Sequence, residues 1–133
     1  MAIIEVKELS KSFENKEAKV EALRNINFNV EEGDIYGIIG YSGAGKSTLI
    51  RLINSIEKPD SGTVKIDGTD INLLDEKSLR NLRKKIGMIF QNFNLLNSAN
   101  VYENIAAPLK NKKNLSKEEI EKKVDSLLKL VDL

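Results

Sequence analysis

Alternating apolar and polar positions mark several short strands, each with one buried face. The alternation is partial over residues 3–9 and clearer over 26–30. A turn signal follows at 31–34, rich in Glu and Gly. A further alternating stretch, 63–67, runs into Asp67-Gly68, a dipeptide typical of tight hairpins. The early part of the chain therefore predicts a small antiparallel β-subdomain.

Two other runs, 35–39 and 86–90, are apolar at nearly every position. Such runs suit strands that are buried on both faces, as in a parallel sheet. Helical periodicity follows the first run, because Leu49, Leu52 and Ile53 fall on one face. The predicted fold class is α/β, with a parallel core that carries the antiparallel β-subdomain.

The chain from about residue 97 onward has helical patterns. Asn100 and Glu103 have the spacing of a capping box, and Pro108 should kink or end the helix that they start. Ser116 and Glu119 form a second box. That box is followed by an apolar stripe, which consists of Ile120, Val124, Leu127, Leu128 and Val131. No Gly or Asn that could cap the helix comes after the stripe. We therefore expect the sequence to end early.

Composition narrows the possible functions. The 133 residues are 41% hydrophobic and 31% charged, with a formal net charge of +1, so charge alone predicts no nucleic-acid binding. Cysteine and histidine are both absent, which excludes disulfides, thiolate metal sites and the commonest general base. No apolar run reaches the roughly 18 residues of a membrane span, and Met1–Ser10 lacks a signal-peptide pattern. We expect a cytoplasmic protein.

A glycine-rich loop carries the clearest chemistry. The run Gly40-Tyr41-Ser42-Gly43-Ala44-Gly45-Lys46-Ser47-Thr48 matches G-x-x-x-x-G-K-[ST] between a predicted strand and a predicted helix. Glycines let consecutive backbone N–H groups wrap phosphates, and the helix start adds its positive end. Lys46 would supply a full charge to the β- and γ-phosphates, and the Ser47 hydroxyl could bind Mg²⁺. We expect a nucleotide site formed by Gly40, Ser42, Gly43, Ala44, Gly45, Lys46, Ser47 and Thr48.

The residues around this loop give the chain a family resemblance. The loop resembles the Walker A motif of ATP-binding cassette (ABC) transporter ATPases, and Phe90-Gln91-Asn92-Phe93-Asn94-Leu95-Leu96 resembles their Q-loop. Leu9-Ser10-Lys11-Ser12-Phe13 resembles their A-loop, whose aromatic residue stacks on adenine. The stretches 23–33 and 59–68 are also similar to the family's sequences. The resemblance implies that Phe13 stacks on the base and that Gln91 contacts Mg²⁺ or water in the catalytic site.

Within the family, residues 35–54 and 86–109 look most like the ATPases of methionine importers. The resemblance implies ATP and Mg²⁺ as ligands, a second ATPase subunit in a homodimer, and an integral membrane permease as partner. A substrate-binding protein would act indirectly, and the subunit would lie at the cytoplasmic face of the plasma membrane. In the permease contact, Phe93, Leu95 and Leu96 would be the apolar residues. The alternative is an ABC ATPase for another substrate, such as polar amino acid import or lipoprotein or peptide export.

Several motifs of the family do not occur in this sequence. The signature motif, the Walker B Asp-Glu pair and the switch histidine all lie downstream of residue 133 in the family. We therefore read residues 1–133 as the N-terminal part of an ABC nucleotide-binding domain. Residues 1–96 would form the P-loop core plus β-subdomain, and 97–133 would start the helical subdomain. Alone, the 133 residues should be inactive as an ATPase.

Three other classes of protein are alternatives to this interpretation. A GTPase would carry Asn-Lys-x-Asp, but the Asn-Lys pairs at Asn15 and Asn111 both lack the Asp, and a kinase would not need a Q-loop. A non-transport ABC ATPase acting on DNA or ribosomes usually carries long insertions or two fused cassettes. A binding protein without activity is the third alternative. A Leu-Ser-Gly-Gly-Gln motif soon after Leu133 would decide for the transporter family.

Overall fold

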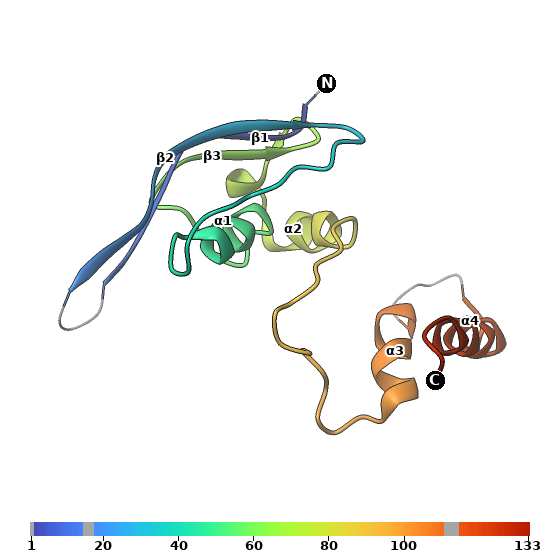
Figure 1. Cartoon of the computed structure of the whole chain (residues 1–133). Helices are drawn as coiled ribbons and strands as arrows, with labels where there is room; N and C mark the ends of the chain where they lie inside the picture. The colour runs from blue at the N-terminus through green and yellow to red at the C-terminus, as the bar shows by residue number, and fades with distance from the viewer. Residues whose placement is uncertain (1, 15–17, 111–114) are drawn as a thin grey trace. The chain divides into compact units, whose positions relative to one another are not determined.

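The computed structural model describes residues 2–14, 18–110 and 115–133, so the segments that begin at Asn15 and Asn111 start outside the described residues. The chain divides into two compact units, Met1–Gly87 and Met88–Leu133, which are described separately here (Figure 1). Its elements are β1 (Ala2–Glu14), β2 (Lys19–Glu31), α1 (Lys46–Ile53), β3 (Ser61–Ile66), β4 (Thr69–Asp70), the 3-10 helix η1 (Ile71–Leu73), α2 (Glu76–Arg83), α3 (Val101–Lys110) and α4 (Lys117–Leu130).

The first unit contains a four-stranded antiparallel sheet with the order β2-β1-β3-β4. Each predicted strand of the β-subdomain is present, and β1 and β2 are longer than their alternating patterns indicated. The predicted hairpin turn is also present, with Asp67 and Gly68 at φ 50° and 71° between β3 and β4. Two positive φ values are the geometry of a type I′ turn, which explains the Asp-Gly sequence.

The core of the first unit lies between this sheet and the helices α1 and α2, which cover one of its faces (Figure 1). Leu49, Leu52 and Ile53 of α1 are buried there, as their spacing predicted. From the sheet, Val6, Leu9 and Val64 are at most 1% exposed. The apolar face of each element thus meets the apolar face of another.

The two apolar runs 35–39 and 86–90 are a correction to the prediction from sequence. Both lie in the described part of the chain and form no strand. Ile35, Ile39 and Ile89 are almost fully exposed, at 103%, 95% and 99%. A strand needs ladder partners for its backbone N–H and C=O groups. Among the described residues, the only ladders are those of β1 with β2, β1 with β3 and β3 with β4. Neither run therefore has a neighbouring strand with which to form a parallel sheet.

Helix α2 is basic, and one of its cations is held by hydrogen bonds. The Arg83 guanidinium donates to the backbone carbonyls of Asn54 and Ser55. These carbonyls follow α1, where a cation complements the negative end of the helix. The side chain therefore fastens α2 to the end of the helix that begins at the glycine-rich loop.

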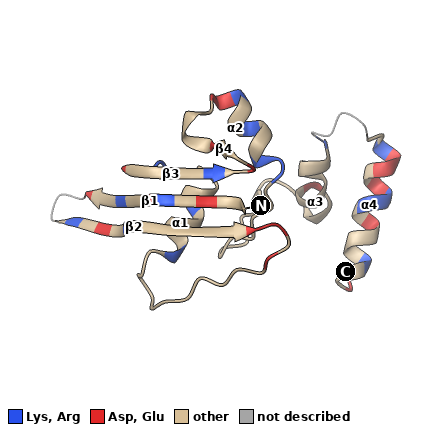
Figure 2. Cartoon of the chain, turned by 90° about the horizontal axis from the view of Figure 1, so that it is seen from above, with Lys and Arg blue, Asp and Glu red and all other residues tan. Residues whose placement is uncertain are grey.

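The second unit is built on the packing of α3 against α4, where Ala106 and Val124 are fully buried. Both predicted capping boxes are present. Asn100 and Glu103 exchange bonds of 3.0 and 2.9 Å, and Ser116 and Glu119 exchange bonds of 2.7 and 3.2 Å. Lys, Glu and Asp residues are spread along α4 (Figure 2), and all of them are exposed.

Two details of the second unit differ from the prediction. Of the two outcomes predicted at Pro108, a kink or an end, the end does not occur, because helix α3 continues to Lys110. Helix α4 is capped at its C-terminus, although neither Gly nor Asn follows it. Asp132 takes the left-handed conformation, with φ 58°, and the N–H groups of Asp132 and Leu133 donate to the carbonyls of Lys129 and Leu128. This is the hydrogen-bond pattern of a Schellman motif, with Asp in the usual place of Gly.

Candidate functional site

The glycine-rich loop joins the exposed run 35–39 to α1. Gly43 and Gly45 have φ 82° and 86°, values that side-chain-bearing residues rarely adopt. The N–H of Ala44 donates to the carbonyl of Tyr41 at 3.2 Å, which closes a tight turn over residues 41–44 that contains Gly43. A Cβ at Gly45 would lie 2.3 Å from the backbone oxygen of Ala22, whereas one at Gly43 would meet no atom within 4 Å. Gly45 is therefore required by both conformation and space.

Helix α1 begins without a side-chain cap. Its N-cap is Gly45, which has no side chain to accept a bond, and the first intrahelical bond runs from Leu49 N to Gly45 O at 2.9 Å. The N–H groups of Lys46, Ser47 and Thr48 thus have no acceptor within the helix. The Ser47 side chain, in the same turn, is exposed. Backbone N–H groups and the positive end of a helix together favour an anion such as phosphate.

Lys46 is held against the loop that it follows. Its Nζ donates to the backbone carbonyls of Gly40 at 2.8 Å and Tyr41 at 2.7 Å. An ammonium has three N–H groups and no acceptor, so these two bonds direct it without neutralising its charge. The structure thus brings together a cation, uncapped amides and an exposed hydroxyl within one loop and helix turn.

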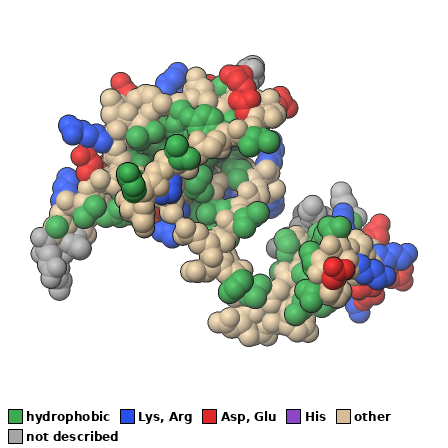
Figure 3. Space-filling view, in the orientation of Figure 1, with side chains coloured by type: hydrophobic (Ala, Val, Ile, Leu, Met, Phe, Trp, Pro, Cys, Tyr) green, Lys and Arg blue, Asp and Glu red, His purple; other side chains and the backbone are tan. Residues whose placement is uncertain are grey.

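A hollow of about 400 Å³ lies beside this loop. Ala44, Gly45 and Lys46 form part of its wall, and apolar side chains of β2 and the run 35–39 form the rest. Among them, Phe28 and Tyr36 are stacked with ring centroids 5.2 Å apart. Figure 3 shows hydrophobic side chains gathered on one face of this unit, which agrees with the exposure of Ile35, Ile39 and Tyr41. The loop therefore borders a surface on which several large apolar side chains are exposed.

Phe13 lies near the outer end of β1, opposite Val20 of β2. Its side chain is 40% exposed, so it is not a residue of the core. The ladder shifts register between Lys11 and Ser12, where β2 carries one extra residue, Ala22. This β-bulge supplies the carbonyl that meets Gly45. Val20, the ladder partner of Phe13, is therefore two residues from Ala22, on the order of 7 Å along the strand.

Gln91 belongs to the second unit and is exposed at a bend. The expectation that it acts with the loop stays a prediction. The same holds for the Mg²⁺ role of Ser47 and for the assignment of residues 97–133 to a helical subdomain. Over the described residues, no three Asp, Glu, His or Cys side chains cluster as metal ligands. A hydroxyl together with phosphate oxygens is still a ligand set that Mg²⁺ accepts.

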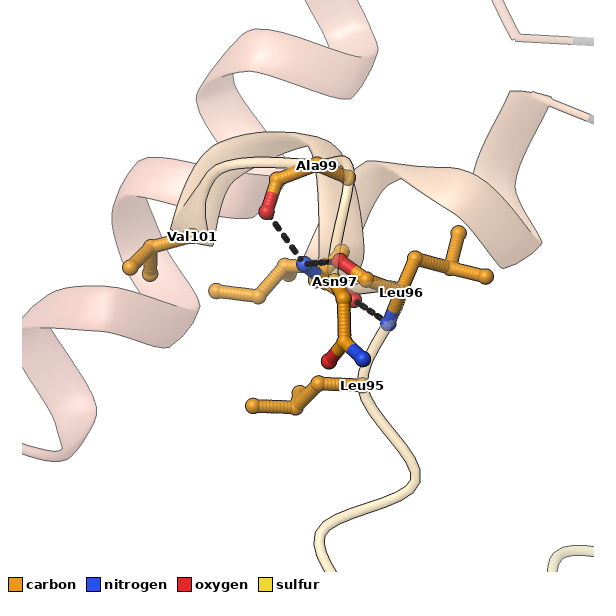
Figure 4. Close-up of a pocket in the computed structure, with 7 residues that line it drawn as sticks. Leu95, Leu96, Asn97, Ala99 and Val101 are labelled. Atoms are coloured by element: carbon orange, nitrogen blue, oxygen red, sulfur yellow. Dashed lines mark hydrogen bonds between the residues drawn. The ribbon is translucent and has the colours of Figure 1, made fainter.

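The segment 91–100, which contains Gln91 and precedes α3, is held by a residue that the sequence reading missed. Asn104 accepts a hydrogen bond from Leu96 N at 2.8 Å and donates to the carbonyls of Leu96, Ala99 and Asn100 at 3.3, 3.1 and 2.9 Å. Beside this clamp is an apolar hollow of about 270 Å³, lined by Leu95, Leu96, Asn97, Ala99, Val101, Asn104 and Ile105 (Figure 4). Phe93, Leu95 and Leu96 are 94%, 61% and 56% exposed.

Neither unit contains a helix, among the residues described, that is long and apolar enough to cross a membrane. The loop and the adjoining sheet have the features of the P-loop class of proteins. The chain belongs to the ABC transporter family, whose model matches residues 23–133. The predicted fold class is confirmed at this level by solved ATP-binding cassettes, which superpose over nearly all of the chain.

One of these structures is a dimeric ATP-binding cassette in a post-hydrolysis state bound to ADP and Pi. It has a TM-score of 0.87 and 37% identity, over 98% of this chain and 57% of that one. A methionine import ATP-binding protein of Enterococcus faecalis is 56% identical over 133 residues, which is 100% of this chain and 38% of the relative. A methionine import ATP-binding protein of Listeria monocytogenes is 52% identical over 131 residues, or 98% and 38%. The chain thus spans less than half the length of these relatives.

Proposed function

We propose that this chain forms the nucleotide-binding part of an ABC importer ATPase that couples ATP hydrolysis to methionine uptake. The observation that carries the proposal is the loop at 40–48, which combines the Lys46 ammonium with the uncapped start of α1. The methionine branch is supported by the names of relatives that are 50% to 56% identical over nearly the whole chain. The wider alternative is an ABC ATPase for a different solute.

In the proposed mechanism, the phosphates of ATP accept hydrogen bonds from the backbone N–H groups at the start of α1. Lys46 exchanges its bonds to the Gly40 and Tyr41 carbonyls for charge-assisted bonds to the β- and γ-phosphates. Phe13 stacks on the base and contributes binding without reading its hydrogen bonds. The loop thus stabilises negative charge that develops during phosphoryl transfer.

Ser47 would be the residue of this chain that binds Mg²⁺, through its exposed hydroxyl. When bound, Mg²⁺ neutralises charge on the β- and γ-phosphate oxygens. Gln91 would contact Mg²⁺ or a water at the γ-phosphate side, which rests on the family resemblance of its segment. The residues that would polarise the attacking water lie downstream of residue 133 in the family. We therefore expect no turnover from the 133-residue chain alone.

The proposed partners are a second ATPase subunit, a membrane permease and, indirectly, a substrate-binding protein. The two subunits would form a homodimer at the cytoplasmic face of the plasma membrane. The exposed apolar residues Phe93, Leu95 and Leu96, beside the hollow that Asn104 shapes, are the surface proposed to contact the permease. The hydrogen bonds of Asn104 can fix the conformation of this surface, while the apolar side chains provide the contact area for a partner.

The function can be tested in a chimera in which this chain replaces the matching residues of the Enterococcus faecalis relative. In cells lacking their own importer ATPase, the chimera should restore methionine uptake. Lys46→Ala should abolish that uptake and reduce ATP hydrolysis to background, because it removes a contact of about 1.5–3 kcal/mol to the phosphates. Wild-type hydrolysis by the Lys46→Ala chimera would contradict the loop assignment. Restored uptake of another solute, but not of methionine, would contradict the methionine branch alone.

The permease contact needs a separate test. Phe93→Ser combined with Leu96→Ser should leave ATP binding by the chimera unchanged and release it from the permease in co-purification. If the double variant still co-purifies and supports uptake, the surface is placed wrongly. Asn104→Ala adds a structural readout, since the Leu96 amide should then exchange with solvent about fivefold faster after losing a bond of about 1 kcal/mol.

A further inference from the structure

The outer part of β1 carries a cation, an aromatic ring and an anchored carboxylate in one cluster. Lys11 Nζ lies 5.3 Å from the centroid of the Phe13 ring. The two residues are two positions apart on a strand, so their side chains share one face of the sheet. A Lys ammonium at this distance from an aromatic ring is attracted by the negative charge of its π face. One face of the Phe13 ring is therefore already covered by a residue of the chain.

Asp60 holds this arrangement in place from the start of β3. Its carboxylate accepts a bond from Lys11 Nζ at 3.2 Å and one from the backbone N–H of Ser12 at 2.6 Å. Its own backbone N–H donates to the carbonyl of Ser10 at 3.0 Å. The Ser12 N–H, and then Lys11, hold the pKa of Asp60 below its usual range. Three bonds thus tie one residue to positions 10–12 of β1.

The cluster is linked to the phosphate loop on both sides. Asp60 lies in the connection that follows α1, the helix whose first turn ends the loop. Across the ladder, Lys11 pairs with Leu23 and Ser12 with Glu21, and the bulged Ala22 between them is the residue whose carbonyl meets Gly45. The direction of the Phe13 ring is therefore set relative to the loop by contacts within the first unit.

We propose that Lys11 and Asp60 are positioning residues for the nucleobase: Lys11 covers one face of the Phe13 ring, Asp60 fixes Lys11, and the base stacks on the opposite face. This proposal rests on the proposed role of Phe13 in base stacking. Neither residue need touch the nucleotide. Their effect is to hold an exposed ring in one orientation, so that less conformational freedom is lost when the base binds.

Two probes separate a contact to the base from a contact to the phosphates. The dissociation constants of Mg-ATP and of Mg-tripolyphosphate, which has no base, are measured on the 133-residue chain by titration calorimetry. Lys11→Met keeps the apolar stem and removes the charge. It should weaken ATP binding about two- to fivefold, the range of an exposed cation–π contact, and leave tripolyphosphate binding unchanged. Lys11→Arg should restore the wild-type ratio of the two constants.

Lys7 provides a matched control, because it lies on the same strand and its Nζ pairs with the Glu5 carboxylate at 3.3 Å. Lys7→Met should change neither constant. Asp60→Asn should lower ATP affinity in the same direction as Lys11→Met, and the double variant should add little, since both changes remove one arrangement. A Lys11→Met variant that loses affinity for both ligands equally would overturn the proposal and make Lys11 a phosphate contact.

The failures of the two proposals can be told apart. If Phe13→Ala leaves the ratio of the two constants unchanged, the stacking role of Phe13 is wrong and this inference falls with it. If Phe13→Ala changes the ratio but Lys11→Met and Asp60→Asn do not, only this inference is wrong.

An NMR readout needs no nucleotide: the Lys11 ε-methylene protons should be shifted upfield by the ring, and Phe13→Leu and Asp60→Asn should each remove the shift. Unshifted protons in the wild-type chain would also overturn the proposal.

Discussion

The helices α1 and α4 begin in opposite ways. At α4, Ser116 and Glu119 satisfy each other's backbone N–H groups, so the helix start is closed by its own side chains. At α1, the N-cap is Gly45, which offers no side-chain acceptor, and an exposed Ser47 and a half-buried Lys46 stand in the first turn. Helices α2 and α3 resemble α4, since Asp75 and Asn100 accept bonds from their first turns.

This difference explains why one helix start of the chain can serve as an anion site. A side-chain cap stabilises a helix by about 1 kcal/mol, and α1 forgoes that contribution. The Asn54 and Ser55 carbonyls after α1 are bound by Arg83, and its apolar face is buried, so the helix is stabilised elsewhere. The amides at its start remain free for a ligand that supplies the missing acceptors.

The largest expected effect comes from a Cβ at Gly45. Gly45→Ala combines a left-handed backbone with an overlap at the Ala22 oxygen, where 2.3 Å is far below contact distance. Mg-ATP binding by the chain should fall by more than about 2 kcal/mol, because the loop must move away from β2. Titration calorimetry measures this, with a thermal melt to confirm that the variant folds.

Gly43→Ala is the matched control for Gly45→Ala. Its φ of 82° is nearly the same, but a Cβ there meets nothing within 4 Å. We expect the free energy of Mg-ATP binding to weaken by only about 1–2 kcal/mol, because only backbone strain contributes. Equal losses in the two variants would show that the contact between Gly45 and Ala22 does not matter for the loop.

A smaller effect is expected at the closed helix start. Ser116→Ala removes the acceptor of the Glu119 N–H and should destabilise the second unit by about 1 kcal/mol. ATP affinity should stay at the wild-type value, because this cap takes no ligand. The measurement is a urea melt followed by circular dichroism. Ser126→Ala, within α4, is the control. If it lowers the free energy of unfolding of the second unit as much as Ser116→Ala does, the stabilising role of the cap is contradicted.

The smallest effect is on pH dependence. The Ser116 backbone N–H, then its hydroxyl, hold the pKa of Glu119 below its ordinary value of 4.5. A lowered folded-state pKa gives stability that is present above the unfolded value and is lost as pH falls through the folded value. The helicity of α4 should therefore decrease on acidification below about pH 4.5. In the Glu119→Gln variant, the helicity measured by circular dichroism should no longer decrease over this pH range. If the decrease is unchanged, it is caused by other carboxyl groups.

Local signals were the part of the structure that could be predicted from sequence. The Asp67-Gly68 turn, both capping boxes and the buried face of α1 depend on residues within a few positions of each other. The family resemblance and the phosphate loop were equally recognisable. The cap at Asp132 was missed because Asp takes the place that Gly or Asn usually fills.

The missed links around the phosphate loop and α1 depend on contacts across long stretches of chain. Asp60 and Lys11 are 49 positions apart, and the carbonyls that Arg83 binds are 28 and 29 positions away. No periodicity reports such pairs. The runs 35–39 and 86–90 failed as strands for a related reason, since an apolar run indicates burial but not which strand it pairs with.

The most direct test of the central claim compares the two helix starts in one experiment. Mg-tripolyphosphate is titrated into the ¹⁵N-labelled chain while the backbone amide resonances are followed. The account predicts saturable shifts at Lys46, Ser47 and Thr48, and none at Lys117, Glu118 and Glu119. If the amides of α1 do not move, or if those of α4 move equally, α1 is not the phosphate site of this chain.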